Sequence, residues 1–259
     1  MKILLFFNLF IFAYSFYPLL DLEPLPENSV VDLPLLNESY EGVERCVSPV
    51  TDQGRCSPWA MVAAQVLSDR FCRNGLPILL SGQDIIDCHL RTCINPKNAT
   101  SIWDYLTDYG IASDECMPYT SWTGFASKCS MNCESKETRK KFKCRRGSAK
   151  KLSSQSEIKL QIERYGSVMA EMDVHLDFIY HQKGIYVHKK DNRDIKDHLG
   201  RHAVRCYGYG SENGVNYWKC ANTWSYNWGD YGVFKIKMGE VGIDSNVWAC
   251  EAGNIESKA

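Results

Sequence analysis

The chain has 259 residues, of which 44% are apolar and 24% are charged, and its formal net charge is -1. This is the composition of a globular protein that is long enough for one or two domains with substantial cores. A net charge close to zero argues against nucleic acid as the main partner, so we expect no nucleic-acid binding.

The first predicted element is a secretory signal peptide over residues 1–15. Lys2 precedes an apolar run that ends in AYS at 13–15, a signal-peptidase type of site. The run is too short to span a bilayer comfortably, and no later segment is apolar enough, so we expect no stable membrane insertion. Residues 16–45 are rich in proline, leucine and acidic residues and predict an extended lead-in. The mature chain is then expected to be secreted or to occupy an endolysosomal or vacuolar lumen.

Twelve cysteines suit such an oxidising compartment, and nine of them precede residue 150. Metal binding is the rival explanation, but there is no CxxC pair, and the Cys129/Cys133 spacing lacks a second ligand pair in zinc-site register. We therefore expect disulfides, with no metal and no cofactor. Asn37 and Asn98 each begin a tripeptide that accepts N-linked glycans.

The apolar spacing predicts helices in the first half of the chain and short strands in the second. Ser81 caps one helix with Asp84 at the capping-box position, and Gly110 and Gly166 end two others. The predicted helices are 59–72, 81–88, 101–109 and 156–165, and the predicted strands are 168–174, 184–188, 202–209, 216–221 and 232–237. The sequence ENG at 212–214 predicts a hairpin turn, and residues 111–151 are expected to be loop-rich. The fold class is α+β, with a helical half over about 46–150 and an antiparallel β half over about 151–254.

A basic segment over residues 136–151 carries nine Lys or Arg residues against one Glu. A polyanion such as a sulfated glycan is one partner that this segment predicts. A solvated loop beside acidic surface is the plainer interpretation, because charge blocks are usually exposed.

Several motifs resemble the papain family of cysteine proteases, in its cathepsin B-like branch. They are TDQGRC…WA, LSDRFC, ECMPY, KCSMNC, GIDSNV and the long block HAVRCYGYGSENGVNYWKCANTWSYNWGDYGVFKI over 202–236. The resemblance covers about residues 33–254 and makes residues 16–32 a short pro-segment. It implies a papain-like two-domain fold, with a helical left domain, an antiparallel β-barrel-like right domain and a cleft between them.

The resemblance also implies roles for individual residues. His202 matches the general base, Asn222 the residue that orients it, and Gln53 a donor to the oxyanion. The residues that the resemblance places along the cleft are Trp59, Trp224, Trp228, Arg201 and Asn246.

The nucleophile is missing from this pattern. Gln53 and Cys56 set the left side of the family motif and Trp59 the right, but two residues stand between Cys56 and Trp59 where the family has three. Counted back from Trp59, Pro58 occupies the nucleophile position. Proline has neither a thiol nor the backbone N–H that the family contributes to the oxyanion hole. Cys56 matches a structural cysteine, and Ser57 is not at the attacking position.

Other departures occur around the cleft. The loop that the family builds as Cys-Asn-Gly-Gly reads CINPK at 93–97. Arg201 replaces the glycine before the catalytic histidine, and Asn246 replaces an acidic residue of the second subsite. The segment between Cys116 and Cys129 lacks the His-His occluding loop, so carboxydipeptidase activity is not implied.

The resemblance implies four disulfides, namely Cys46–Cys72, Cys56–Cys93, Cys88–Cys129 and Cys116–Cys133. Cys144, Cys206, Cys220 and Cys250 remain either buried thiols or locally paired. The sequence thus predicts a cathepsin B-like peptidase homologue that is inactive and binds peptides or proteins. The alternatives are a residual cysteine-type endopeptidase and a structural or adhesion module that binds polyanions through residues 136–151.

Overall fold

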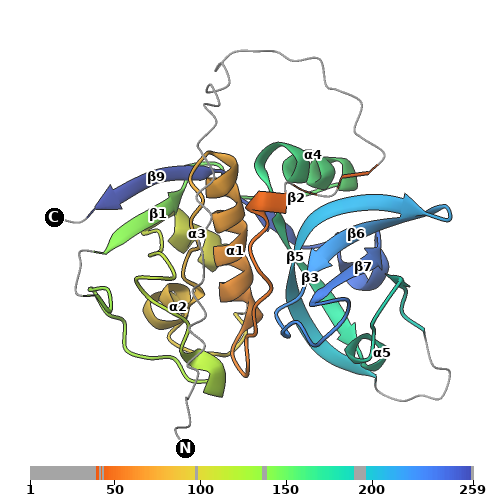
Figure 1. Cartoon of the computed structure of the whole chain (residues 1–259), viewed down its shortest axis with the longest axis horizontal. Coiled ribbons are helices and arrows are strands. Elements are labelled where there is room, and N and C mark those ends of the chain that lie inside the picture. The colour runs from red at the N-terminus through yellow and green to blue at the C-terminus, as the bar shows by residue number, and fades with distance from the viewer. Residues whose placement is uncertain are drawn as a thin grey trace, which may run out of the picture. The chain divides into compact units, whose positions relative to one another are not determined.

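Helices and strands segregate along the chain in the computed structural model, and this confirms the α+β prediction (Figure 1). The helical elements of the first half are η1 (Glu44–Cys46), α1 (Pro58–Arg73), α2 (Gly82–Ile85), the π-helical η2 (Ile86–Leu90), α3 (Thr100–Asp108) and η3 (Ser121–Thr123). The helices of the second half are α4 (Gln155–Tyr165), α5 (Leu176–Ile179) and η4 (Glu240–Gly242). The strands are β1 (Lys140–Cys144), β2 (Lys150–Leu152), β3 (Val168–His175), β4 (Ile185–Tyr186), β5 (His198–Glu212), β6 (Val215–Ala221), β7 (Val233–Lys237), β8 (Val247–Ala249) and β9 (Ala252–Ser257).

The structure describes residues 39, 40, 42, 44–96, 99–135, 139–189 and 197–257, all within the unit Leu33–Ala259. The predicted signal peptide and pro-segment, and the predicted glycan acceptors Asn37 and Asn98, lie outside them. Among the described residues, no helix combines the length and apolarity needed to cross a membrane.

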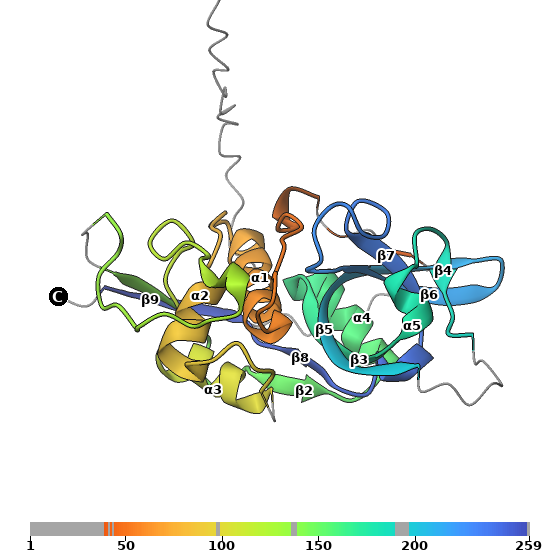
Figure 2. The ribbon, with the colours of Figure 1, turned by 90° about the horizontal axis from the view of Figure 1, so that it is seen from below.

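Helix α1 lies between the helices α2 and α3 on one side and the large sheet on the other in both views (Figures 1 and 2). Ser57 precedes it in extended backbone, and Pro58 opens it, because a first-turn residue needs no N–H for the helix ladder. All residues of α1 except the last two are buried. A helix that is covered on every side needs the mixed apolar sequence seen here rather than one apolar stripe.

The large sheet has seven strands in the order β2-β8-β3-β5-β6-β7-β4. Every neighbouring pair is antiparallel except β4 and β7, which run parallel, so the prediction of an antiparallel half is confirmed for all but this edge pair. The predicted hairpin joins β5 to β6 through Asn213 and Gly214, both at positive φ as a tight two-residue turn requires. The apolar residues of this half form their own core, separate from the core around α1.

A buried polar network joins the two halves. The Asp69 carboxylate of α1 accepts hydrogen bonds from the Ser48 backbone N–H at 2.7 Å, from the Ser167 hydroxyl at 2.5 Å and from the Arg205 guanidinium of β5 at 2.6 Å. Arg205 is fully buried and also donates to the Ser48 carbonyl. Because the two buried charges pair with each other, the network places β5 beside α1 without leaving an unpaired ion.

Parts of the basic segment are strands rather than loop. Residues 140–144 and 150–152 are strands, and β1 pairs with β9 through Lys140↔Ser257 and Phe142↔Ile255 (Figure 2). Cations and apolar residues alternate over residues 141–144, as in a strand with one buried face. The partner of this strand is β9, at the far end of the chain. The chain therefore returns to the helical half after residue 251, inside the stretch predicted for the β half.

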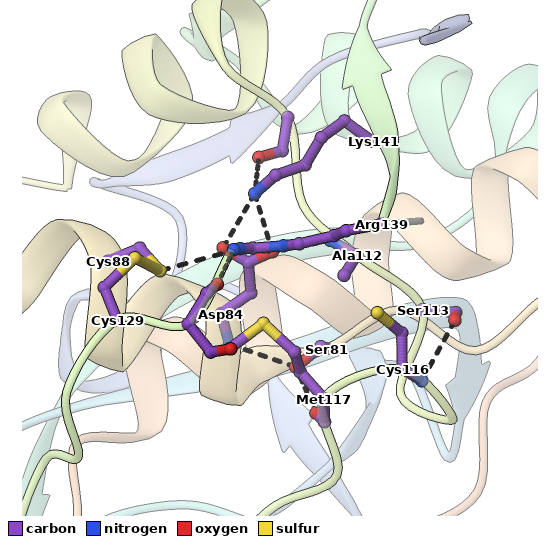
Figure 3. A network of polar contacts seen from close by, with 12 residues as sticks. Ser81, Asp84, Cys88, Ala112, Ser113, Cys116, Met117, Cys129, Arg139 and Lys141 are labelled. Atoms are coloured by element: carbon purple, nitrogen blue, oxygen red, sulfur yellow. Dashed lines mark hydrogen bonds and ion pairs between the residues drawn. A yellow bond between two sulfur atoms is a disulfide. The ribbon is translucent and has the colours of Figure 1, made fainter. Parts of the chain in front are cut away.

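Buried acid pairs with this segment from inside the protein (Figure 3). Asp84 has no exposed side-chain surface, and it forms ion pairs with Arg139 and with Lys141, the latter at 2.8 Å. Its carboxylate also accepts hydrogen bonds from the Ala112 N–H and the Tyr105 hydroxyl. Further ion pairs join Lys143 to Glu256, Arg145 to Glu251 and Lys150 to Glu157.

The structure contains all four disulfides that the resemblance implies. Cys144 pairs with Cys250, and Cys206 pairs with Cys220 directly across β5 and β6. All twelve cysteines of the sequence are therefore disulfide-bonded, and none is free. The possibility that these last four are thiols is thereby excluded in this structure.

Candidate functional site

Two short segments meet where the candidate site forms. Residues 51–53 run antiparallel to residues 223–225, with a bridge between Asp52 and Trp224. The Gln53 N–H donates to the Thr223 carbonyl at 2.8 Å, and the Ser225 N–H donates to the Thr51 carbonyl at 3.1 Å. This pairing brings the turn ahead of α1 to the end of β6, so residues about 170 positions apart form one site.

His202 and Asn222 are in direct contact. His202 lies on β5 and Asn222 directly follows β6, and the His202 Nε2 atom is 2.8 Å from the Asn222 Oδ1 atom. An amide oxygen can only accept, so the ring carries its proton on Nε2 and leaves Nδ1 as an acceptor. The same oxygen accepts the Thr223 N–H at 2.8 Å, which holds the amide in place.

His202 is neutral at physiological pH. Burial lowers the pKa of His202 to about 4, and the hydrogen bond to Asn222 acts in the opposite direction. In a cysteine protease the histidine takes the proton of the thiol and becomes charged. Here the ring has no such proton donor at the nucleophile position, and it remains a neutral imidazole.

An aromatic shelf packs against this pair. The Trp224 ring lies 4.8 Å from the His202 ring, and Trp228 meets Trp224 edge-on at 5.2 Å. The Trp228 indole N–H donates to the Ile179 carbonyl at 3.0 Å, which fixes its orientation. Trp59, by contrast, is only 3% exposed and packs in the core around α1. The expectation that Trp59 lines the cleft is wrong, because its ring fills the helical core.

The turn that leads into α1 carries no free thiol. Pro58 is buried at the first position of α1, Ser57 precedes it, and Cys56 is bonded to Cys93. The Ser57 hydroxyl is buried and has no hydrogen-bond partner among the described residues. It therefore has no base to activate it.

Gln53 is committed to structural hydrogen bonds. Its Nε2 atom donates to the Cys56 carbonyl at 2.7 Å, and its Oε1 atom accepts from the Thr223 hydroxyl at 2.6 Å. An oxyanion hole needs donors directed at the reacting carbonyl. In this structure Pro58 supplies no N–H, and one Gln53 N–H is already used.

The two substituted cleft positions have new partners. The Arg201 guanidinium is 2.8 Å from the carboxylate of Glu171, which is buried on β3. The Asn246 side-chain oxygen accepts the Trp248 indole N–H at 3.0 Å, and its backbone carbonyl accepts the Glu171 N–H. The sequence analysis did not single out Glu171, although an acid inside the apolar run of β3 is the kind of signal that marks a functional position.

A cavity of about 480 Å³ opens beside Gln53, and the sequence analysis missed it. Its apolar and aromatic lining includes Met61 of α1, Tyr119, Trp122 and Tyr226. Tyr119 and Trp122 meet edge-on at 4.8 Å, and Asp52 supplies an acidic group to the rim. These residues come from four separate segments, so no local pattern in the sequence could have assembled them.

Comparison with known proteins agrees with this geometry. The family model described as "Papain family cysteine protease" matches residues 37–251. The chain therefore belongs to the papain family of cysteine proteases. Within that family, the relatives described below are cathepsin B or cathepsin B-like proteins.

The chain is 34% identical to cathepsin B of Dictyostelium discoideum, over 78% of this chain and 69% of the relative. It is 32% identical to cathepsin B-like cysteine proteinase 4 of Caenorhabditis elegans, with the same coverage of 78% and 69%. Among solved structures, procathepsin B S9 from Trypanosoma congolense superposes with a TM-score of 0.77 at 28% identity. That superposition covers 86% of this chain and 80% of the other.

Proposed function

We propose that this papain-family chain is a catalytically inactive cathepsin B-like protein that binds a peptide or protein segment. One observation carries the proposal: all twelve cysteines are in disulfides, and Pro58 stands where the family has its nucleophile. Losing a nucleophile costs about 10⁶-fold in rate, and losing an oxyanion donor costs roughly 10²–10³-fold. Either loss is sufficient to end useful turnover.

The remaining site favours binding of an extended peptide. The neutral His202 ring has Nδ1 free to accept a hydrogen bond, although the ring itself is buried. The cavity beside Gln53 has an apolar lining with Asp52 and Asp114 among its residues. Such a pocket suits a side chain with an apolar stem and a basic head, because the stem is buried while the charge meets a carboxylate.

The compartment in this proposal is the outside of the cell or an endolysosomal lumen. Six disulfides support it, because protein disulfides persist in oxidising environments.

An active-site probe tests the inactivity. The wild-type protein is expected to show no labelling by an epoxide that alkylates catalytic thiols and no cleavage of a dipeptidyl fluorogenic substrate. Replacing Ser57-Pro58 by Gly-Ser-Cys restores the family spacing and is expected to restore labelling. Gly-Ser-Ser is the matched control and is expected to remain unlabelled. Labelling of the wild type that rises and falls with cleavage would overturn the proposal. Absence of labelling in the Gly-Ser-Cys variant would show that residues 93–97 or Arg201 also close the cleft.

A fluorescence-polarisation screen of a basic and apolar peptide library tests the binding. Trp122→Ala removes part of the cavity wall, and it is expected to weaken a selected peptide about tenfold or more. Phe125→Ala is the control, since Phe125 is exposed nearby but does not line the cavity. Equal affinities for the two variants would place the ligand elsewhere.

The two alternatives have less support. A residual endopeptidase would require Cys56 to leave its disulfide with Cys93. A polyanion at residues 139–151 would have to compete with the acids that already pair with Arg139, Lys141, Lys143, Arg145 and Lys150.

A further inference from the structure

A cluster of histidines and aspartates lies at one end of the β half, apart from His202 and Asn222. His175 ends β3, His188 follows β4 closely, and Asp197 directly precedes β5. The Leu176 N–H donates to the Asp197 carbonyl at 2.9 Å, which ties that residue to the end of β3. Three elements that are separate in the sequence therefore present three metal-ligating side chains to one another.

The ligand atoms of the three side chains are close enough together to share one ion. The His175 Nδ1 atom is 3.2 Å from one Asp197 carboxylate oxygen, and the His188 Nε2 atom is 3.5 Å from the other. The three ligand atoms all lie within 4.8 Å of one another. For metal–ligand bonds of about 2.0–2.2 Å, two ligands of a tetrahedral zinc ion stand roughly 3.4 Å apart. The separation of 3.5 Å at His188 exceeds an ordinary hydrogen bond and corresponds to such an edge.

The surroundings of His188 are those of a metal ligand. Its other ring nitrogen, Nδ1, lies 3.1 Å from the Asp177 carboxylate. Asp177 is held in turn by the Tyr186 hydroxyl at 2.7 Å and the Lys189 N–H at 2.9 Å. A carboxylate behind a histidine fixes its tautomer, and with Nδ1 protonated by this contact, Nε2 is the free ligand atom.

The cluster has one carboxylate for two imidazoles. The His175 and His188 rings stack with centroids 3.8 Å apart, and Asp197 presents one oxygen toward each. All three side chains are partly buried, and the Asp197 carboxylate is the most exposed of them. Three protein ligands and one water complete a four-coordinate site.

We propose that His175, His188 and Asp197 form a binding site for one Zn²⁺ ion or a similar divalent transition metal. Two imidazoles and one carboxylate favour such an ion over Ca²⁺ or Mg²⁺, which take oxygen ligands. The bound ion takes the place of the contact between the His175 ring and Asp197, and it ties the end of β3 to the residues flanking β4 and β5. This site is separate from the proposed peptide site, and its experimental test does not depend on peptide binding.

Titration calorimetry of the full-length, untagged protein with ZnCl₂ after chelator treatment tests the proposal. One equivalent of Zn²⁺ is expected to bind, and a hundredfold excess over Kd is expected to raise the Tm by on the order of 5 °C. Mg²⁺ is expected to have no effect. Bound Co²⁺ is expected to give the intense visible bands of four-coordinate geometry, a readout that does not depend on stability.

Single substitutions assign the ligands. His188→Gln is expected to weaken Zn²⁺ binding by more than a hundredfold, and Asp177→Asn, which acts through His188, by about 10–100-fold. His89→Gln is the matched control, because His89 stacks on Tyr105 in the helical half and is expected to leave affinity unchanged. The Tm of each variant without metal checks that it is folded. No stoichiometric binding by the wild type, or equal affinities for the His188→Gln and His89→Gln variants, would overturn the proposal.

Discussion

The two sides of the candidate site have changed to very different extents. On the β side, His202, Asn222 and Trp224 keep the contacts that orient a catalytic histidine. On the helical side, the first turn of α1 begins with Pro58, the residue that we propose stands at the nucleophile position, and it carries no free thiol. The difference teaches that the histidine side also has a structural role, because residues 223–225 pair with residues 51–53 and hold the two segments together. The first turn of α1 needs no thiol for its structure, because a proline can begin a helix as well as a cysteine can.

The buried polar network around Asp69, which joins the helical half to the β half, gives the largest expected effect. Asp69→Ala removes the acceptor for Ser48, Ser167 and Arg205 and leaves the Arg205 charge buried without its partner. We expect a loss of about 3–5 kcal/mol in the free energy of unfolding, measured by urea denaturation. Glu212→Ala, which breaks the exposed pair with Lys235, is the control and should cost less than about 1 kcal/mol. Equal losses would mean that the network does not join the halves.

The contribution of His202 to stability can be measured from the pH dependence of unfolding. The pKa of His202 is lowered from 6.5 to about 4 by burial, so the unfolded chain takes up the proton first as the pH falls. The stability that His202 contributes is therefore complete above about pH 6.5 and is lost as the pH falls toward about 4; the total is about 3 kcal/mol at most. His202→Gln is expected to flatten the fall in urea stability over this range. Parallel curves for wild type and His202→Gln would contradict the assignment.

Gln53 connects the two sides directly. Gln53→Ala removes its hydrogen bonds to Cys56 and Thr223 and leaves the buried Thr223 hydroxyl without its acceptor. The expected cost is about 1–3 kcal/mol in thermal or urea unfolding. Gln155→Ala is the control, because Gln155 forms its hydrogen bond to Asp244 at an exposed position. If Gln53 were only a vestige of an oxyanion hole, the two variants would lose the same small amount.

The smallest expected effect is at Ser57 and has the opposite sign. Its hydroxyl is buried without a partner among the described residues, so Ser57→Ala is expected to be neutral or to stabilise by about 1 kcal/mol. Ser81→Ala is the contrasting control, because the Ser81 hydroxyl caps α2 through the Asp84 N–H and should cost about 1–2 kcal/mol. Destabilisation by Ser57→Ala would reveal a partner for this hydroxyl.

Local sequence patterns located most elements. The helix over 59–72, the helix capped by Ser81 and the turn at 212–214 all appear within a residue or two of their predicted bounds. These elements depend on apolar periodicity, capping residues and turn residues. All three are patterns among neighbouring positions, so they can be recognised in the sequence before the fold is known. The strands β1 and β9 were missed because each is defined by the other, more than a hundred residues away.

For the site, the sequence by itself predicted that the nucleophilic thiol is absent, that Pro58 takes its position and that His202 pairs with Asn222. Those conclusions depend on motif spacing alone. Only the tertiary structure decided that Gln53 donates to Cys56, that Glu171 pairs with Arg201, and that Asp84 holds the basic segment from inside. The physical reason is that the sign and strength of a charge or hydrogen-bond contact depend on which distant group the folded backbone places within about 3 Å, and no local pattern contains that distance.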